Sequence, residues 1–201
     1  MTEKQCEVIL DAIHKKKNII AAGGTASGKT TFLNAILAEI SKLDECIITI
    51  EDTKELKCTA ANKVALSTTD TVDMENLLRK TLRLSPNRIV VGEVRGKEAL
   101  ILMDAWSTGH RGGCSTVHSD SAADTLFRLE DLVSRVSLST QQAGIARAID
   151  VIVYIARRAT SRKVEEVLAI DGWDREFQST RPRGARHNAD EPDEDKDLFQ
   201  S

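Results

Sequence analysis

The sequence predicts an α/β fold in which a mainly parallel central sheet is flanked by helices. Short apolar segments alternate with amphipathic ones along most of the chain, as in repeated strand–helix units. The apolar segments are continuous rather than alternating, which is typical of strands buried on both faces of a parallel sheet. One of them, NIIAAGG at 18–24, leads into a glycine-rich loop that opens a helix.

Each element is predicted from its hydrophobic pattern. The first helix is expected over 2–17, where Cys6, Ile9, Leu10 and Ile13 recur at helical spacing. Further helices are expected over 29–43, 72–84, 97–107, 122–136 and 139–150. Strands are expected within 18–24, 46–52, 63–67, 88–93, 113–118, 151–156 and 163–170.

The composition suits one domain and a tail. The 201 residues are 41% hydrophobic and 29% charged, enough for one substantial core, which we expect over 1–172. Residues 173–201 are charged and poor in apolar side chains, so we expect them to be disordered and to serve as a solvating appendage or an interaction arm. The first 170 residues have a net charge of +1. Direct sequence-specific binding of nucleic acid is therefore not expected.

Several other protein classes do not fit the sequence. No segment approaches the roughly 18 apolar residues of a membrane-spanning helix, and the first residues mix polar and apolar side chains unlike a signal peptide. The four cysteines have neither C-x-x-C spacing nor a histidine at zinc-finger distance, so no disulfide framework or structural metal is predicted. These features indicate a cytoplasmic protein with reduced thiols.

A phosphate-binding loop is predicted at GGTASGKTT, which fits the pattern G-x-x-x-x-G-K-[ST]. Glycines allow successive N–H groups to turn inward at the start of a helix, where they bind anions. Lys29 is expected to contact the β and γ phosphates of ATP, and the Thr30 hydroxyl to bind Mg²⁺. At Ala26 a positive φ would add strain. The predicted nucleotide-binding residues are Gly23, Gly24, Thr25, Ala26, Ser27, Gly28, Lys29, Thr30 and Thr31.

Two apolar segments end in carboxylates. Glu93 follows RIVVG, and Glu51 and Asp52 follow IITI. Because ligands of open α/β sheets bind at the carboxyl ends of the strands, Glu93 and Glu51 are expected to approach the phosphate loop. There they would bind Mg²⁺, partly through water, or activate the attacking water. The alternative is that these carboxylates are ordinary turn residues.

The stretch STGHRGGCSTVHSDSA supplies two histidines. His110 lies in a glycine-rich turn and His118 follows a short strand, so both are candidates for hydrogen bonds to a γ phosphate, with incidental loop histidines as the alternative. Zinc is not expected, since no third ligand has a suitable spacing. Arg79, Arg83 and Arg95 are candidates for a contact with a neighbouring subunit's phosphate, although solvated arginines are the default expectation for such a pattern.

Taken in order, the phosphate loop, IITIEDTKEL, RIVVGEVRG and STGHRGGCSTVHSD resemble the Walker A, Asp box, Walker B and His box of the secretion-superfamily ATPases. Within that group the sequence is most similar to the TrbB-like conjugative transfer ATPases of type IV secretion systems, over about residues 5–170. The resemblance implies a RecA-like domain that hydrolyses ATP with Mg²⁺ at the subunit interfaces of a hexamer. It also implies Glu51 from the Asp box, Glu93 as the water-activating carboxylate, and roles for His110 and His118.

The resemblance further implies a peripheral location at the bacterial inner membrane and contacts with type IV secretion components there. Members of this family usually carry an additional N-terminal domain, whereas here the phosphate loop begins near residue 23. The chain is therefore similar to the ATPase domain alone. The alternatives are a nucleotide-binding interaction module or inactive fragment, a motor of type II secretion or type IV pili, and a small-molecule kinase.

Overall fold

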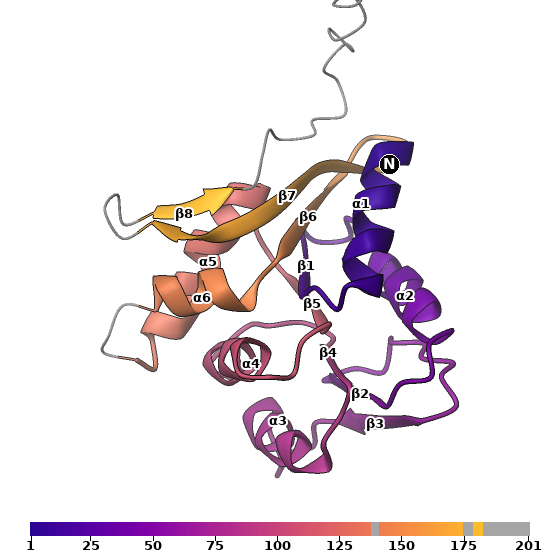
Figure 1. The fold of residues 1–201 in the computed structure, drawn as a ribbon, viewed down its shortest axis with the longest axis vertical. Coiled ribbons are helices and arrows are strands. Elements are labelled where there is room, and N and C mark those ends of the chain that lie inside the picture. Colours follow the sequence, from indigo (N-terminus) through magenta and orange to yellow (C-terminus); the bar gives the residue numbers. More distant parts are fainter. Residues whose placement is uncertain (138–140, 175–178, 183–201) are drawn as a thin grey trace, which may run out of the picture.

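The computed structural model describes residues 1–137, 141–174 and 179–182, and its centre is an eight-stranded sheet (Figure 1). The strand order is β3-β2-β4-β5-β1-β6-β7-β8, and every pair from β3 to β6 is parallel. β7 and β8 add an antiparallel edge. The strands are β1 Ile19–Ala22, β2 Ile47–Glu51, β3 Lys63–Ser67, β4 Arg88–Val91, β5 Cys114–Val117, β6 Val151–Arg157, β7 Arg162–Asp174 and β8 Ser179–Pro182.

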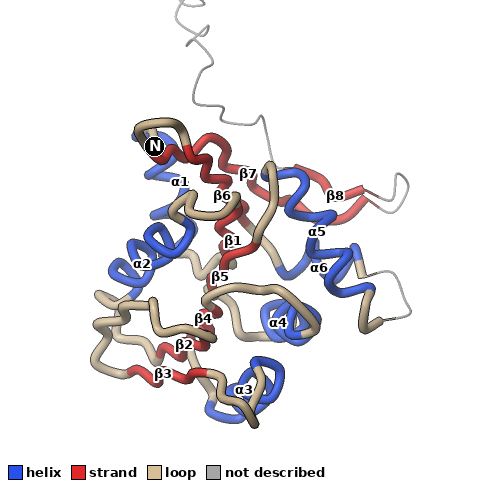
Figure 2. Tube along the Cα trace, turned by 180° about the vertical axis from the view of Figure 1, so that it is seen from behind, coloured by secondary structure: helices blue, strands red, loops and turns tan. Residues whose placement is uncertain are grey.

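Helices cover both faces of this sheet, which gives three layers (Figure 2). α1 and α2 pack on one face, whereas α3, α4, α5 and α6 pack on the other. The helices are α1 Glu3–His14, α2 Lys29–Ile40, α3 Met74–Thr81, α4 Glu98–Ser107, α5 Ala122–Ser134 and α6 Gln142–Ala148, with a 3₁₀ turn η1 at Leu82–Leu84.

The central strands β1, β2, β4 and β5 are largely apolar because successive residues face opposite helical layers. In β1, Ile19 belongs to the core beneath α1 and α2, and Ile20 belongs to the core beneath α4 and α5. In β2, Ile47 and Ile48 divide in the same way. All residues of β1, β2, β4 and β5 are buried. The prediction of a parallel sheet buried on both faces is confirmed.

The predicted elements all occur, most with shorter ends, whereas β6 and β7 extend beyond the predicted 151–156 and 163–170. The helix expected over 72–84 ends at Thr81 and continues only as the turn η1, because Pro86 lies shortly beyond and disfavours helix in the residue before it. The helix expected over 139–150 is α6, which begins at Gln142, and its expected start at 139–140 lies outside the described residues.

The antiparallel strands extend beyond the expected boundary at residue 172. β7 continues to Asp174, and 179–182 form β8, which pairs with 170–174. Part of the segment expected to be a disordered tail is thus assigned to a strand, because an available strand edge provides backbone hydrogen bonds whatever the composition of the added strand. The rest of the predicted tail, 175–178 and 183–201, lies outside the described residues.

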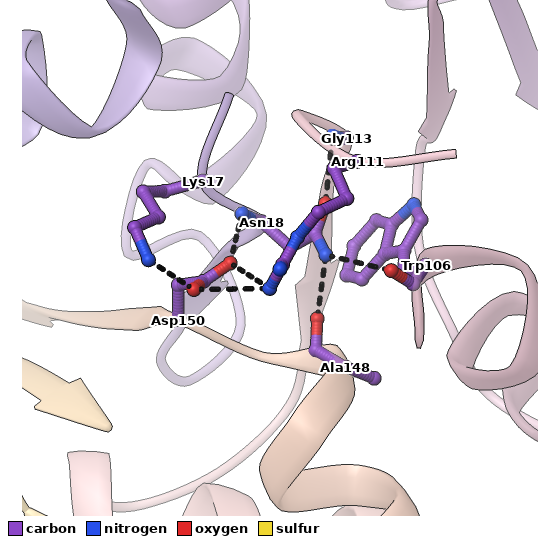
Figure 3. Close-up of polar contacts among 7 residues, drawn as sticks. All are labelled: Lys17, Asn18, Trp106, Arg111, Gly113, Ala148 and Asp150. Atoms are coloured by element: carbon purple, nitrogen blue, oxygen red, sulfur yellow. Dashed lines mark hydrogen bonds and ion pairs between the residues drawn. The ribbon is translucent and has the colours of Figure 1, made fainter. Parts of the chain in front are cut away.

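A polar network fixes the starts of three central strands (Figure 3). Asn18, just before β1, donates its backbone N–H to the Asp150 carboxylate at 2.8 Å and accepts the Gly113 N–H at 3.0 Å. Asp150 immediately precedes β6 and also pairs with Lys17 at 2.8 Å and Arg111 at 3.3 Å. The network thus connects the amino ends of β1, β5 and β6, at the end of the strands opposite the phosphate loop.

Candidate functional site

The carboxyl ends of β1, β2, β4 and β5 border a cavity of about 510 Å³. This volume lies within the range of small-molecule sites, roughly 300–1,000 Å³. The lining comes from loop residues 25–31, from the last residues of the three other strands and the segments that follow them, and from Arg162 of β7. The cavity therefore combines the predicted phosphate loop with the predicted carboxylates.

The backbone of the loop has the conformation that anion binding requires. Gly23 and Gly28 have φ values of 153° and 99°, and α2 begins directly afterwards at Lys29. A Cβ on Gly23 would lie 2.2 Å from the Ile155 carbonyl oxygen, so a larger residue cannot occupy that position. Ala26 has a φ of 57°, the strained conformation considered from the sequence. Such strain costs about 1–3 kcal/mol and is maintained by surrounding contacts.

Lys29 is held by the loop itself. Its ammonium donates to the carbonyls of Gly23 at 2.8 Å and Gly24 at 2.9 Å. Burial lowers the pKa of Lys29 below 10.5, and the nearby Glu93 carboxylate partly opposes this shift. Gly23 and Gly24 are thus placed behind the cavity as acceptors for the lysine, while 25–31 line the cavity.

The hydroxyl residues of the loop differ in their environments. Thr25 and Thr31 are exposed in the cavity lining, and Thr30 is partly exposed. Ser27 is buried, and its Oγ has no hydrogen-bond partner among the described residues. A partly exposed Thr30 at the first turn of α2 is accessible to a cation in the cavity.

Glu93 lies between the side chains of Arg95 and His118. The Arg95 guanidinium donates to its Oε2 at 2.6 Å, and Nε2 of His118 lies 3.2 Å from its Oε1 without the alignment of a hydrogen bond. Glu93 is also the principal cause of the raised pKa of Arg95. The backbone beneath it is fixed by Gly92, whose N–H donates to the Ile50 carbonyl and whose carbonyl accepts from Thr116 Oγ1.

Glu51 lines the same cavity, but one of its carboxylate oxygens is already hydrogen-bonded to the backbone. Its side chain is 6% exposed, and Oε2 accepts the backbone N–H groups of Glu55 at 2.7 Å and Leu56 at 2.9 Å. The carboxylate therefore fixes the loop after β2. Asp52 lies nearer the solvent, accepts from Thr68 Oγ1 at 3.0 Å and is 3.9 Å from Arg95.

The two predicted histidines are not brought together. His118 follows β5 and lines the cavity, whereas His110 precedes β5 and is not among the cavity residues. Residues that precede and follow the same strand lie at opposite ends of that strand, so His110 and His118 are separated by the length of β5. The neighbour of His110, Arg111, belongs to the network at the starts of the strands (Figure 3). Of the two predicted histidines, only His118 lies at the cavity within one copy of the chain.

The predicted arginines also separate. Only Arg95 lines the cavity, while Arg79 pairs with Glu75 at 3.0 Å on the exposed face of α3 and Arg83 is exposed in η1. Sequence reasoning missed Arg162, which is 139 positions away from Gly23 in the chain and has no local pattern that could identify it.

Arg88 was likewise not identified. It begins β4, is 1% exposed, pairs with Glu45 and donates to the carbonyls of Gly112 and Ile13. An arginine directly before the apolar run IVV was the signal available in the sequence. These contacts stabilise the edge of the sheet away from the cavity.

Two further findings concern metals and membranes. Among the described residues, no three His, Cys, Asp or Glu side chains lie close enough to bind a metal ion by themselves. Thr30, Glu51 and Glu93 nevertheless provide the oxygen ligands that Mg²⁺ prefers, and this ion usually relies on one or two side chains, waters and phosphate oxygens. The described helices include none that is long and apolar enough to cross a membrane.

Comparisons with known proteins extend over nearly the whole chain. The family model described as "Type II/IV secretion system protein" matches residues 1–194. The conjugal transfer protein TrbB of Rhizobium radiobacter is 49% identical over 175 residues, which are 86% of this chain and 54% of that protein. The chain thus spans about half the length of this relative.

Solved structures of similar proteins share the fold. The VirB11 ATPase of the Brucella suis type IV secretion system, in complex with sulphate, aligns with a TM-score of 0.77 and 30% identity, covering 83% of this chain and 52% of that one. The pilus retraction motor PilT with bound ADP aligns with a TM-score of 0.68 and 26% identity, covering 84% and 51%. The fold is therefore that of the secretion ATPases, and the chain belongs to the type II/IV secretion system protein family.

Proposed function

We propose that this chain is an ATP-hydrolysing motor domain that powers conjugative transfer of DNA or protein, or pilus assembly, in a type IV secretion system. The observation that carries the proposal is the meeting of the Lys29 loop and Glu93 in one cavity. A positively charged loop and a carboxylate at the carboxyl end of another strand of the same sheet, here β4, suit hydrolysis of a nucleoside triphosphate. The family and the similarity to conjugal transfer and secretion ATPases support the cellular role.

In this proposal the triphosphate lies along residues 23–31. The backbone N–H groups at the start of α2 bind the phosphates, and Lys29 leaves the carbonyls of Gly23 and Gly24 to contact them. Mg²⁺, bound by Thr30 and by Glu51 and Glu93 partly through water, would neutralise charge on the phosphates.

Glu93 orients and activates the attacking water. Its carboxylate lies beside His118 and faces the cavity from the end of β4. His118 is placed to donate to the γ phosphate or to the water once Glu93 is engaged. Glu51 has one oxygen committed to the backbone at 55–56, so its remaining oxygen suits a ligand or positioning role. Because of this commitment we assign the role of base to Glu93.

The assembly proposed for this domain is a homohexamer in the bacterial cytoplasm, peripheral to the inner membrane and in contact with secretion components there. Hydrolysis at subunit interfaces would allow a neighbour to complete each site. His110, at the opposite sheet edge, is available for a role in such an assembly. We propose no direct sequence-specific contact with nucleic acid.

A second candidate is a nucleotide-binding module that does not hydrolyse ATP by itself. It is favoured by one observation, that Arg95 donates to Glu93 at 2.6 Å and so occupies one oxygen of the carboxylate assigned as the base.

Steady-state ATP hydrolysis with Mg²⁺ over a range of protein concentrations separates these candidates. Lys29→Ala and Glu93→Gln are compared with Lys42→Ala and Glu39→Gln, which alter an exposed ion pair on and beside α2. We expect turnover per subunit to rise with concentration in the wild type and both controls, and to be lost in both site variants. ATP binding without turnover at any concentration supports the module, and absence of ATP binding contradicts both candidates.

A further inference from the structure

Arg162 connects the antiparallel edge of the sheet to the phosphate loop. β6 runs parallel to β1, so its carboxyl end emerges beside the loop, and the chain then reverses into β7. Arg162 is the first residue of β7 and pairs in register with Arg157. The reversal places an arginine from late in the chain over a loop formed near its start.

The contact between Arg162 and the loop is specific. Its Nε donates to the carbonyl of Ala26 at 3.1 Å, and its stem packs so closely on Gly28 that a Cβ there would lie 2.8 Å from Arg162 Cδ. Ala26 is the residue with a φ of 57°, so the hydrogen bond is made to the strained position of the loop. The arginine thereby helps to maintain the loop conformation before a ligand binds.

The terminal nitrogens of the same guanidinium have no acceptor among the described residues. The other cations of the cavity are engaged, Lys29 by loop carbonyls and Arg95 by Glu93. Arg162 lines the cavity and contacts Ala26 and Gly28, directly before the amino end of α2 where phosphates bind. A guanidinium fixed at Nε keeps its planar pair of Nη donors for one external acceptor, and a phosphate matches that geometry.

We propose that Arg162 is a nucleotide-positioning residue that binds the phosphate chain of the nucleotide with its Nη groups while its Nε holds the loop. This inference rests on the proposed function, because it assigns a further ligand contact within that site. It adds to the loop a cation from a different part of the fold. The β6–β7 reversal then becomes part of the nucleotide site.

The test compares binding of ADP and ATP to the wild type, Arg162→Gln and Arg162→Lys, with Arg157→Gln as the control. Arg157 is exposed on the same reversal and does not line the cavity. We expect Arg162→Gln to bind both nucleotides about tenfold or more weakly, as is typical for loss of a charge-assisted hydrogen bond. Its affinity should also depend less steeply on salt, because one cation no longer faces the phosphates.

Arg162→Lys should keep the salt dependence of binding but recover only part of the nucleotide affinity, because lysine retains the charge without the planar pair of Nη donors. Wild-type affinity in Arg162→Gln would overturn the inference. So would weaker binding with an unchanged salt dependence, which would make Arg162 only a support for Ala26. If the wild type binds no nucleotide, whereas it unfolds cooperatively, the proposed function itself fails, and the two failures are therefore distinguishable.

Discussion

The ammonium of Lys29 donates to the Gly23 carbonyl at 2.8 Å, so the lysine that is expected to meet a phosphate is bound to its own loop. Burial of this ammonium lowers its pKa below 10.5. At pH values below the folded-state pKa both folded and unfolded chains carry the charge, and the folded state bears the full cost of burying it. Between the folded-state pKa and 10.5 the unfolded chain binds more protons, so the free energy of unfolding rises with pH.

This relationship predicts how Lys29→Met affects the ligand-free protein. The stability of the wild type relative to the variant should increase as the pH is raised from 7 towards 10.5, because the buried group becomes neutral in the folded state first. Urea unfolding at several pH values measures the difference. Lys42→Met, at an exposed lysine, serves as the control for general alkaline effects. A wild-type-minus-variant difference that stays flat or falls with pH contradicts the prediction.

The two histidines provide a matched pair for turnover. His118 lies 3.2 Å from Glu93, whereas His110 lies at the other edge of the sheet. We expect His118→Asn to lower the rate of ATP hydrolysis by about 10- to 100-fold, as for loss of a hydrogen bond to a charged group. Nucleotide affinity should change less than the rate. His110→Asn should leave the single-turnover rate unchanged, and an equal loss in both variants would show that location relative to the cavity is not decisive.

Gly113 is predicted to tolerate no side chain. A Cβ there would lie 2.2 Å from Trp106 Nε1 and 2.5 Å from the Ile89 carbonyl oxygen, and Trp106 is fully buried. Gly113→Ala should therefore lower the free energy of unfolding by about 1–3 kcal/mol or prevent folding, as overpacking does. Gly24→Ala, where nothing lies within 4 Å, is the control for stability. Similar thermal denaturation of both variants would contradict this account.

Asp150 is predicted to be important for stability although it lies far from the cavity. It accepts the Asn18 N–H and pairs with Lys17 and Arg111 (Figure 3). Asp150→Ala should lower the free energy of unfolding by about 2–4 kcal/mol, because a buried N–H and a partly buried cation lose their partner. Asp11→Ala, in the exposed pair with Lys15, should change it by less than about 1 kcal/mol. Chemical denaturation measures both, and comparable small effects would refute the structural role.

Much of the site could be predicted because its signals are local. The glycine and lysine spacing of 23–31 specifies the loop, and a continuous apolar run that ends in a carboxylate places Glu93 at the end of a buried strand. Parallel strands share one carboxyl edge, so the loop and Glu93 meet without knowledge of the strand order. The same rule placed Glu51 near the cavity but did not reveal that one of its oxygens binds the backbone at 55–56.

The sequence by itself determined the α/β pattern, the phosphate loop and the carboxylate at the end of β4, because each depends on neighbouring residues. Tertiary structure decided the order of the strands, the separation of His110 from His118, the formation of β8 within a segment of polar composition, and the position of Arg162 over Ala26. These features depend on backbone pairing and packing between segments that are distant along the chain. Such contacts produce no periodic pattern in the sequence of either segment, so they are established only when the sheet assembles.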